Sequence, residues 1–328
     1  MTLPMTMQAI EMNGAGGPEV LRGGQRAIPQ PGAGQVLVKV AYAGVNGPDL
    51  MQRKGLYPAP KGASDLLGLE IAGEVVAVGA DTRRFTVGDT LCGLTNGGGY
   101  AEYCAILADH CLPIPAGVTV AQAASLPEAF FTVWSNVFMG AGLKAGETFL
   151  VHGGAGGLGT AAIQLGKAFG ARVIATDHPA DRVATCIELG ADRALDYETE
   201  DFVEVVRGMG GADVILDIVG GAYVERNIKA TRHDARIVQL AFALGSKVQI
   251  DLMPIMLKRL HYTGSTLRSR SDAFKRDVAR ELEAKVWPLF AAGTLKPVVG
   301  TTLPLAEAAE AHRLMERAGH CGKIVLQA

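Results

Sequence analysis

The stretch Gly153–Asp177, GGAGGLGTAAIQLGKAFGARVIATD, decides the fold, because it joins a glycine-rich turn to a helix, a strand and a terminal acid. It follows the apolar segment ETFLVH, which we expect to form a strand. Its spacing G-x-G-x-x-G, in this context of strand, turn and helix, is typical of a dinucleotide-binding turn, in which bare backbone approaches the pyrophosphate at the start of the helix. The predicted cofactor contacts in this turn are Gly154, Gly156, Gly157, Leu158 and Gly159.

Asp177 closes this stretch, 18 residues beyond Gly159. An acid at this distance binds the adenosine ribose of NAD and repels the 2′-phosphate of NADP, so this residue by itself favours NAD. Two alternatives stay open. In the first, Asp177 would cap the next helix, whose first turn would include Pro179. In the second, Arg182 would turn towards a phosphate group of the cofactor.

The composition indicates a globular protein of two domains. The chain has 328 residues, and 31 basic against 33 acidic side chains give a net charge of −2. These charges are mixed along the sequence, so we expect no nucleic-acid partner. The five cysteines lack paired spacing, no leader precedes Met7, and no apolar run is long enough to span a membrane, so we expect a cytoplasmic protein without a membrane partner.

The pattern of apolar residues changes along the chain. Up to about residue 120, short runs rich in Val, Ile and Tyr between turn residues predict an antiparallel sheet. Residues 121–141 predict a helix, and from Glu147 strands alternate with helices, which is typical of a doubly wound parallel sheet. From about Ser269 two helices and a last strand follow, and we expect them to return to the first domain. The fold class is therefore α/β.

Several motifs in order give the chain a family resemblance. It resembles the zinc-free quinone oxidoreductases of the medium-chain dehydrogenase/reductase superfamily, and most closely the p53-inducible quinone reductase branch. Besides the glycine turn, the motifs that carry the resemblance are GVNGPDLMQRKGLYPAPKGAS (44–64), LGLEIAGEVVAVG (67–79), EDFVEVV (200–206), DVILDIVGG (213–221), GSTLRSRS (264–271) and GKIVL (322–326).

The resemblance implies a GroES-like β-barrel catalytic domain of residues 1–124 and 269–328, and a Rossmann cofactor domain of residues 125–268 with a doubly wound parallel sheet. It implies an active cleft between them, a homodimer formed through the edge strand near Leu260–Thr266, and hydride transfer from NADPH to quinones or other α,β-unsaturated carbonyl compounds. The family position that matches Asp177 is usually small and uncharged. The resemblance therefore favours NADPH, while Asp177 keeps NADH open.

The resemblance also implies that the protein binds no metal. Zinc-dependent relatives carry their first two zinc ligands, Cys and His, at the positions of Asn46 and Leu69, and neither residue found here suits zinc. The segment SLPEAFFTVW, where the third ligand would lie, has no cysteine, and the cysteine spacing does not fit a structural zinc lobe.

Further site residues are implied by the resemblance. Tyr57 would polarise the substrate oxygen, Asn46 would donate a hydrogen bond to the substrate or cofactor, and Thr132 would hold the nicotinamide carboxamide. Arg268 would reach the cofactor from the edge of the cofactor domain. Independently of the resemblance, Leu240 and Phe242 follow a predicted strand end, where ligands bind in open parallel sheets, so we expect their backbone to meet the nicotinamide. Each of three residues also has a structural alternative: Tyr57 as an ordinary half-buried tyrosine, Asn46 as a side chain that stabilises a turn, and Arg268 as a surface charge.

Residues outside this set are interpreted as structural. Glu128 is more often structural than catalytic in such a segment, His152 and His261 read as core or edge residues, and Cys186 reads as a small buried hydrophobe.

Two other functions remain open. On the same fold the substrate would be an enoyl thioester or an aldehyde, since loops around a cleft decide the substrate. The second open function is that of a protein that binds NADPH without catalysis, as the lens crystallins of this family do.

Overall fold

The computed structural model describes residues 3–317 and 319–328, which form two compact units. One unit is continuous, Thr132–Leu267, and the other is split between Met1–Phe131 and Arg268–Ala328. We call them the continuous unit and the split unit. The first boundary falls inside helix α3 (Pro127–Val133), seven residues beyond the predicted 124/125, and the second differs by one residue from the predicted 268/269.

The described part of the continuous unit contains a six-stranded parallel sheet, as predicted. Its spatial order is β10-β9-β8-β11-β12-β13, the order 3-2-1-4-5-6 of a doubly wound dinucleotide-binding sheet. The strands are β8 (Thr148–His152), β9 (Arg172–Asp177), β10 (Arg193–Asp196), β11 (Ala212–Asp217), β12 (Thr231–Gln239) and β13 (His261–Gly264).

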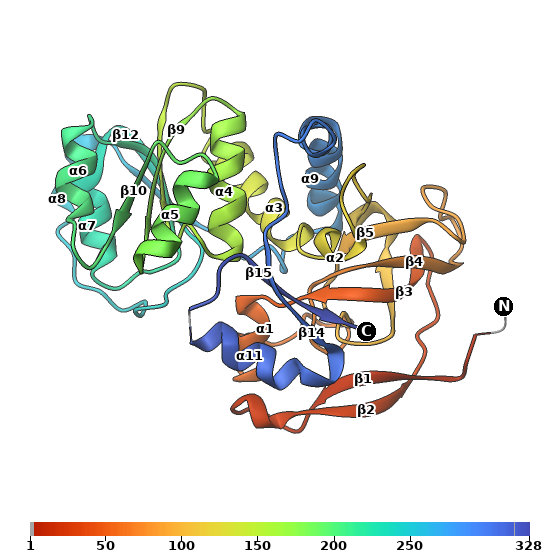
Figure 1. The fold of residues 1–328 in the computed structure, drawn as a ribbon. Helices are drawn as coiled ribbons and strands as arrows, with labels where there is room; N and C mark the ends of the chain where they lie inside the picture. The colour runs from red at the N-terminus through yellow and green to blue at the C-terminus, as the bar shows by residue number, and fades with distance from the viewer. Residues whose placement is uncertain (1–2, 318) are drawn as a thin grey trace. The chain divides into compact units, whose positions relative to one another are not determined.

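Helices cover this sheet because its central strands are apolar on both faces. Phe149, Leu150 and Ile174 are fully buried, which requires helices on both sides of the strands. Figure 1 shows α6, α7 and α8 grouped together, apart from α4 and α5. The helices are α4 (Gly157–Ala168), α5 (Ala180–Glu188), α6 (Phe202–Gly208), α7 (Tyr223–Ala230) and α8 (Met253–Lys258).

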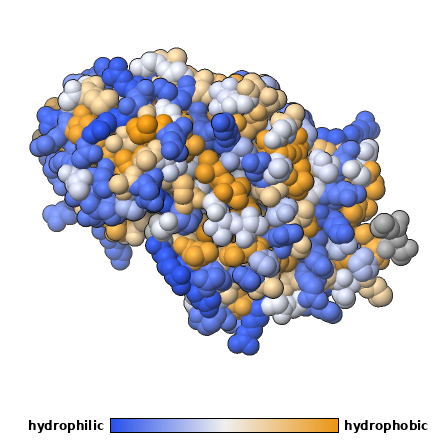
Figure 2. Space-filling view, in the orientation of Figure 1, coloured by the Kyte–Doolittle hydropathy of each residue, from blue (hydrophilic) through white to orange (hydrophobic). Residues whose placement is uncertain are grey.

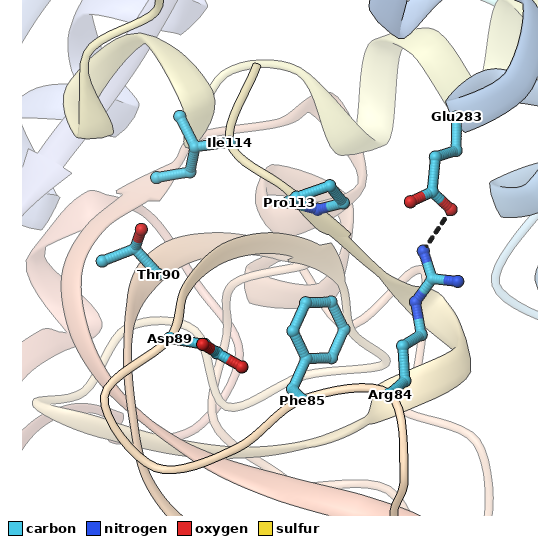
Figure 3. A pocket seen from close by; sticks show the side chains of 7 residues that line it. All are labelled: Arg84, Phe85, Asp89, Thr90, Pro113, Ile114 and Glu283. Atoms are coloured by element: carbon cyan, nitrogen blue, oxygen red, sulfur yellow. Dashed lines mark hydrogen bonds and ion pairs between the residues drawn. The ribbon is translucent and has the colours of Figure 1, made fainter. Parts of the chain in front are cut away.

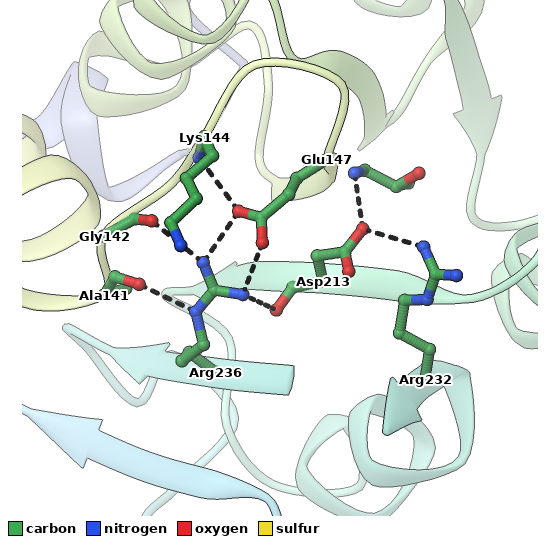
Figure 4. Close-up of polar contacts among 8 residues, drawn as sticks. Ala141, Gly142, Lys144, Glu147, Asp213, Arg232 and Arg236 are labelled. Atoms are coloured by element: carbon green, nitrogen blue, oxygen red, sulfur yellow. Dashed lines mark hydrogen bonds and ion pairs between the residues drawn. The ribbon is translucent and has the colours of Figure 1, made fainter. Parts of the chain in front are cut away.

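Arg236 on β12 holds the loop that leads into β8 (Figure 4). Its guanidinium donates to the carbonyl oxygens of Ala141 at 2.7 Å and Gly142 at 3.1 Å, and to Glu147 Oε2 at 2.7 Å. Next to it, Asp213 accepts from the backbone N–H of Thr148 at 2.8 Å. The start of the first strand of this sheet is thereby fixed to its neighbours.

The split unit is built around a seven-stranded sheet, in which six strands follow the order β14-β15-β3-β4-β5-β7 and the seventh, β6, pairs with β3. The last strand of the chain, β15, pairs antiparallel with β3, so the carboxyl terminus does return to the first domain. These strands are β3 (Gln35–Gly44), β4 (Glu70–Val78), β5 (Thr90–Leu94), β6 (Tyr103–Leu107), β7 (Cys111–Pro113), β14 (Val299–Pro304) and β15 (Lys323–Gln327), and a separate hairpin joins β1 (Thr6–Met12) to β2 (Leu21–Ala27).

The helix predicted over residues 121–141 is wrong as a single element. The chain forms α2 (Val120–Ala123), α3 from Pro127, and a π-helix (Trp134–Gly140). Pro127 lacks an N–H and disfavours helical backbone before it, so a new helix starts there. The remaining helices of the split unit are α1 (Gly47–Arg53), α9 (Asp272–Lys285), α10 (Trp287–Ala291) and α11 (Ala308–Glu316).

The surface mixes residue types. On the face drawn in Figure 2, hydrophilic residues are interspersed with hydrophobic ones. None of the helices in the described residues is long and apolar enough to cross a membrane.

Candidate functional site

The glycine turn lets helix α4 lie directly against the end of β8. A Cβ added to Gly159 would lie 2.2 Å from the carbonyl oxygen of Gly153, and one added to Gly154 would lie 2.6 Å from Cys186 Sγ. Both positions therefore need glycine for close packing. Cys186 is fully buried, which explains its place as a small hydrophobe behind the turn.

The start of α4 has the chemistry of an anion site. Gly156 is its N-cap and provides no side-chain hydrogen bond to the helix. The N–H groups of the first turn point out of a helix, and the dipole is positive at this end, so a pyrophosphate fits here. The residues present therefore fit a dinucleotide.

Asp177 lies beside this turn and is bound within the protein. Oδ1 accepts from the backbone N–H of His178 at 2.8 Å and from Arg182 Nε at 2.7 Å. Oδ2 accepts from the backbone N–H of Ala155 at 2.7 Å and from Arg182 Nη2 at 3.1 Å. Asp177 and Arg182 are only 3% and 8% exposed. The N-cap of α5 is Pro179, so the interpretation of Asp177 as the helix cap is wrong.

The segment after β12 lies at the carboxyl end of the parallel sheet. The backbone N–H of Leu240 donates to the carbonyl of Asp217 at 2.8 Å, and that of Leu244 donates to Val219 at 2.8 Å. Leu240 is half-buried and Phe242 is 47% exposed. Ligands of doubly wound sheets bind outside this edge, and the predicted contact of these two residues with the nicotinamide stays a prediction.

Thr132 begins the continuous unit. It is half-buried, and its carbonyl accepts from Asn136 Nδ2 at 2.9 Å. Its predicted role at the nicotinamide stays a prediction.

In the split unit, Asn46 belongs to a buried polar cluster. Asn46 Nδ2 donates to Glu70 Oε1 at 2.9 Å, and Lys323 Nζ donates to Asn46 Oδ1 and, at 2.5 Å, to Glu70 Oε1. The three residues are at most 7% exposed. The Asn46 amide is thus bound at both ends, and its Nδ2 also donates to the carbonyl of Gly44 at 3.4 Å, so its predicted donation to a substrate stays a prediction.

Glu70 also reaches the start of α3. Its Oε2 accepts from the backbone N–H of Glu128 at 2.9 Å. Burial, and after it the neighbouring Glu70 carboxylate, raise the pKa of Glu128 to about 8. Asp49, which accepts from the backbone N–H groups of Asn46 and Gly68, has its pKa raised to about 6 by burial.

Sequence reasoning missed Glu70 and Lys323 as members of this cluster. They come from segments far apart in the chain, and neither segment shows that its charged residue has a partner in the other. A signal was present at Gly44, where a Cβ would lie 2.0 Å from Glu70 Oε1. That glycine leaves room for the carboxylate.

Tyr57 and Arg268 are brought together. The guanidinium carbon of Arg268 lies 5.6 Å from the centroid of the half-buried Tyr57 ring. Arg268 donates to Gln52 Oε1 at 2.7 Å and, through Nε, to the carbonyl of Asn96 at 3.0 Å. Arg268 is 7% exposed, so its interpretation as a surface charge is wrong. It is the first residue of the split unit after the boundary with the continuous unit. Its contact with a cofactor stays a prediction.

His152 lies in the core of the continuous unit. Its two ring nitrogens lie 2.8 Å from Thr176 Oγ1 and 2.8 Å from Asn227 Oδ1. Asn227 in turn donates to Asp217 Oδ2 at 2.9 Å. His261, by contrast, is exposed on β13. Both histidines therefore fit the core and edge positions expected for them.

Neither of the two cavities described contains a predicted site residue. A cavity of about 450 Å³ in the split unit is drawn in Figure 3, with the Arg84–Glu283 ion pair at its edge. A larger one, of about 770 Å³, is lined by residues 60–66 and by Asn96 and His110. Among the described residues no group of three or more His, Cys, Asp or Glu side chains is placed to hold a metal ion.

Comparison with known proteins shows the family. Residues 32–116 match the alcohol dehydrogenase GroES-like domain, and residues 157–284 match the zinc-binding dehydrogenase domain. The human quinone oxidoreductase is 31% identical over 98% of this chain and 97% of its own. The chain belongs to the quinone oxidoreductase family.

Similar solved structures have the same fold. The Escherichia coli quinone oxidoreductase complexed with NADPH matches with a TM-score of 0.88 and 29% identity, over 98% of this chain and 100% of its own. An NAD-dependent alcohol dehydrogenase matches with a TM-score of 0.87 and 33% identity, over the same shares of the two chains. The GroES-like and Rossmann architecture implied by the motifs is thereby confirmed, and the protein is an oxidoreductase of the quinone oxidoreductase family.

Proposed function

We propose that this protein is an NADPH-dependent reductase that delivers a hydride to quinones or other α,β-unsaturated carbonyl compounds. The observation that carries the proposal is the glycine turn, where Gly154 and Gly159 are packed too closely for any other residue and open onto the uncapped start of α4. The names of its relatives, a quinone oxidoreductase and a structure with NADPH, support the substrate class and the cofactor.

In this proposal the two units divide the work. The continuous unit holds the cofactor, with the first-turn N–H groups of α4 on the pyrophosphate and the backbone at Leu240 and Phe242 near the nicotinamide. When bound, NADPH supplies the hydride. The split unit holds the substrate, and the Tyr57 hydroxyl donates a hydrogen bond to the carbonyl oxygen, on which negative charge grows during reduction.

We also propose that the reaction needs no metal. The support is the chemistry of the side chains at the positions that hold zinc in zinc-dependent relatives. Asn46 is committed to Lys323 and Glu70, and Leu69 has no donor atom. Activity should therefore survive dialysis against a strong chelator, and elemental analysis should find less than stoichiometric zinc.

We further propose that the protein is a homodimer. Strand β13 is exposed along its whole length, and among the described residues it pairs on one side only, with β12. An unpaired edge strand favours pairing with another chain. Exposed apolar side chains stand nearby in sequence, on and around α8: Leu252, Met253, Met256, Leu257 and Tyr262.

Sedimentation velocity tests the dimer. Thr263→Pro removes a backbone donor from β13 and should shift the protein to a monomer, whereas Val87→Lys, at an exposed residue of the split unit, should not. A monomeric wild type at working concentration would rule the dimer out.

The catalytic proposal is tested with the purified protein and NADPH. Loss of the near-ultraviolet absorbance of the reduced nicotinamide is followed after adding 1,4-benzoquinone, 9,10-phenanthrenequinone or a simple enone. We expect turnover with at least one acceptor. Tight NADPH binding without turnover of any acceptor would instead favour a protein that binds the cofactor without catalysis.

A further inference from the structure

We infer that Arg182 determines the cofactor preference of this protein by neutralising Asp177, so that an acid in the position that normally selects NADH leaves the site open to NADPH. The inference rests on the proposed function, because it requires a dinucleotide at the glycine turn. It assigns Arg182 as a specificity-determining residue that acts through its neighbour.

The acceptor positions of the Asp177 carboxylate are already occupied by donors of the protein. A carboxylate offers about four lone-pair positions to donors. The two oxygens of Asp177 already accept four hydrogen bonds, from two backbone N–H groups and from two nitrogens of Arg182. A ribose hydroxyl would have to displace one of these donors. In this arrangement Asp177 binds groups of the protein itself and does not bind the ribose.

Asp177 holds the glycine turn in place. Ala155, whose N–H it binds at 2.7 Å, lies between Gly154 and Gly156 inside the glycine turn and is fully buried. The carboxylate thus ties the turn to the end of β9. Loss of that bond would leave a buried N–H without an acceptor, which is unfavourable.

The positive charge of Arg182 compensates the negative charge of Asp177. The pair is nearly buried and bidentate, with Nε at 2.7 Å from Oδ1 and Nη2 at 3.1 Å from Oδ2, the geometry in which a guanidinium compensates a carboxylate best. A 2′-phosphate approaching Asp177 therefore meets a pair without net charge. The next acid along the sheet, Asp196, is itself bound by His178 Nδ1 at 2.9 Å.

The test is a set of four proteins titrated calorimetrically with NADPH and with NADH: wild type, Arg182→Met, Asp177→Asn and the double variant. We expect Arg182→Met to lose at least about tenfold more affinity for NADPH than for NADH, since it leaves Asp177 charged and unpaired. Asp177→Asn keeps an acceptor for Ala155 and should leave NADH affinity within about threefold of wild type. The double variant should return to the wild-type preference.

The double variant separates this inference from direct contact between Arg182 and the phosphate. If Arg182 binds the phosphate itself, the double variant stays at least about tenfold weaker for NADPH than wild type, and the inference is overturned. It is also overturned if Asp177→Asn loses about tenfold in NADH affinity, because Asp177 would then be a ribose ligand. Melting temperatures of the proteins without nucleotide show whether each variant folds. If Arg182→Met does not fold, the double variant decides alone, since it leaves no buried charge unpaired.

The proposed function fails separately. If the wild type binds neither nucleotide, the proposed function falls and takes this inference with it. If both bind and Arg182→Met leaves their ratio unchanged, only the inference falls.

Discussion

Lys323 at the start of β15 donates to Oε1 of Glu70 at the start of β4 at 2.5 Å, with both side chains buried. The same Glu70 carboxylate accepts hydrogen bonds from the side chain of Asn46 and from a backbone N–H in the first turn of α3. The pair therefore joins the last strand of the chain to the part of the split unit in which the predicted residue Asn46 lies.

Breaking this pair should destabilise the protein strongly. Lys323→Met leaves the Glu70 carboxylate buried without its cation, and we expect unfolding free energy to fall by about 3–5 kcal/mol. Urea denaturation measures it. The matched control is Glu70→Gln combined with Lys323→Met, which removes both charges and should recover much of the loss. Equal losses in the single and double variants would show that the charge pair is not the cause.

Glu128 should make stability depend on pH. Its pKa lies near 8 in the folded protein, against 4.5 as its ordinary value, because burial and the nearby carboxylates of Glu70 and Asp49 outweigh Lys323 and Lys275. Between these two pH values the unfolded chain releases a proton that the folded protein keeps, so this contribution to stability is present in acid and is lost as pH rises through about 8.

The variant Glu128→Gln tests this pH dependence. Its unfolding free energy should change less than that of the wild type between about pH 5 and about pH 9, as followed by thermal or urea unfolding. Parallel curves for the two proteins would mean that Glu128 titrates normally.

Gly159→Ala should abolish dinucleotide binding. The added methyl group would lie 2.2 Å from the carbonyl of Gly153, so α4 or the turn must move away from the pyrophosphate position. The control is Gly208→Ala in α6, where a Cβ meets nothing within 4 Å. Calorimetric titration with NADPH should show no binding for the first variant and wild-type binding for the second. Retained affinity in Gly159→Ala would place the cofactor elsewhere.

Tyr57→Phe should slow reduction without unfolding the protein. Loss of one hydrogen bond to a developing oxyanion corresponds to about 1.5–3 kcal/mol, or roughly tenfold to a hundredfold in kcat/KM. Tyr42→Phe, at another half-buried tyrosine of the split unit, is the control and should have wild-type kinetics. Equal kinetics in both variants would remove Tyr57 from the mechanism.

The parallel sheet could be predicted from the sequence because its strands are continuous apolar runs between turns and helices. The side-chain partners could not. The position of Asp177 followed from its distance to Gly159, but its pairing with Arg182 depends on how α5 leaves the strand. The Glu70–Lys323 pair joins residues 253 positions apart, from 70 to 323, and neither shows its partner locally. The helix expected over residues 121–141 was wrong because the break at Pro127 outweighs the apolar pattern.

The most direct test of the central claim is single-turnover oxidation of bound NADPH by 9,10-phenanthrenequinone in a stopped-flow instrument, compared with NADPH deuterated at both C4 positions. The account predicts oxidation within one turnover and a slower rate with the deuterated cofactor, because the transferred hydride leaves from C4. Bound NADPH that stays reduced, with this quinone and with an enone in its place, would contradict it.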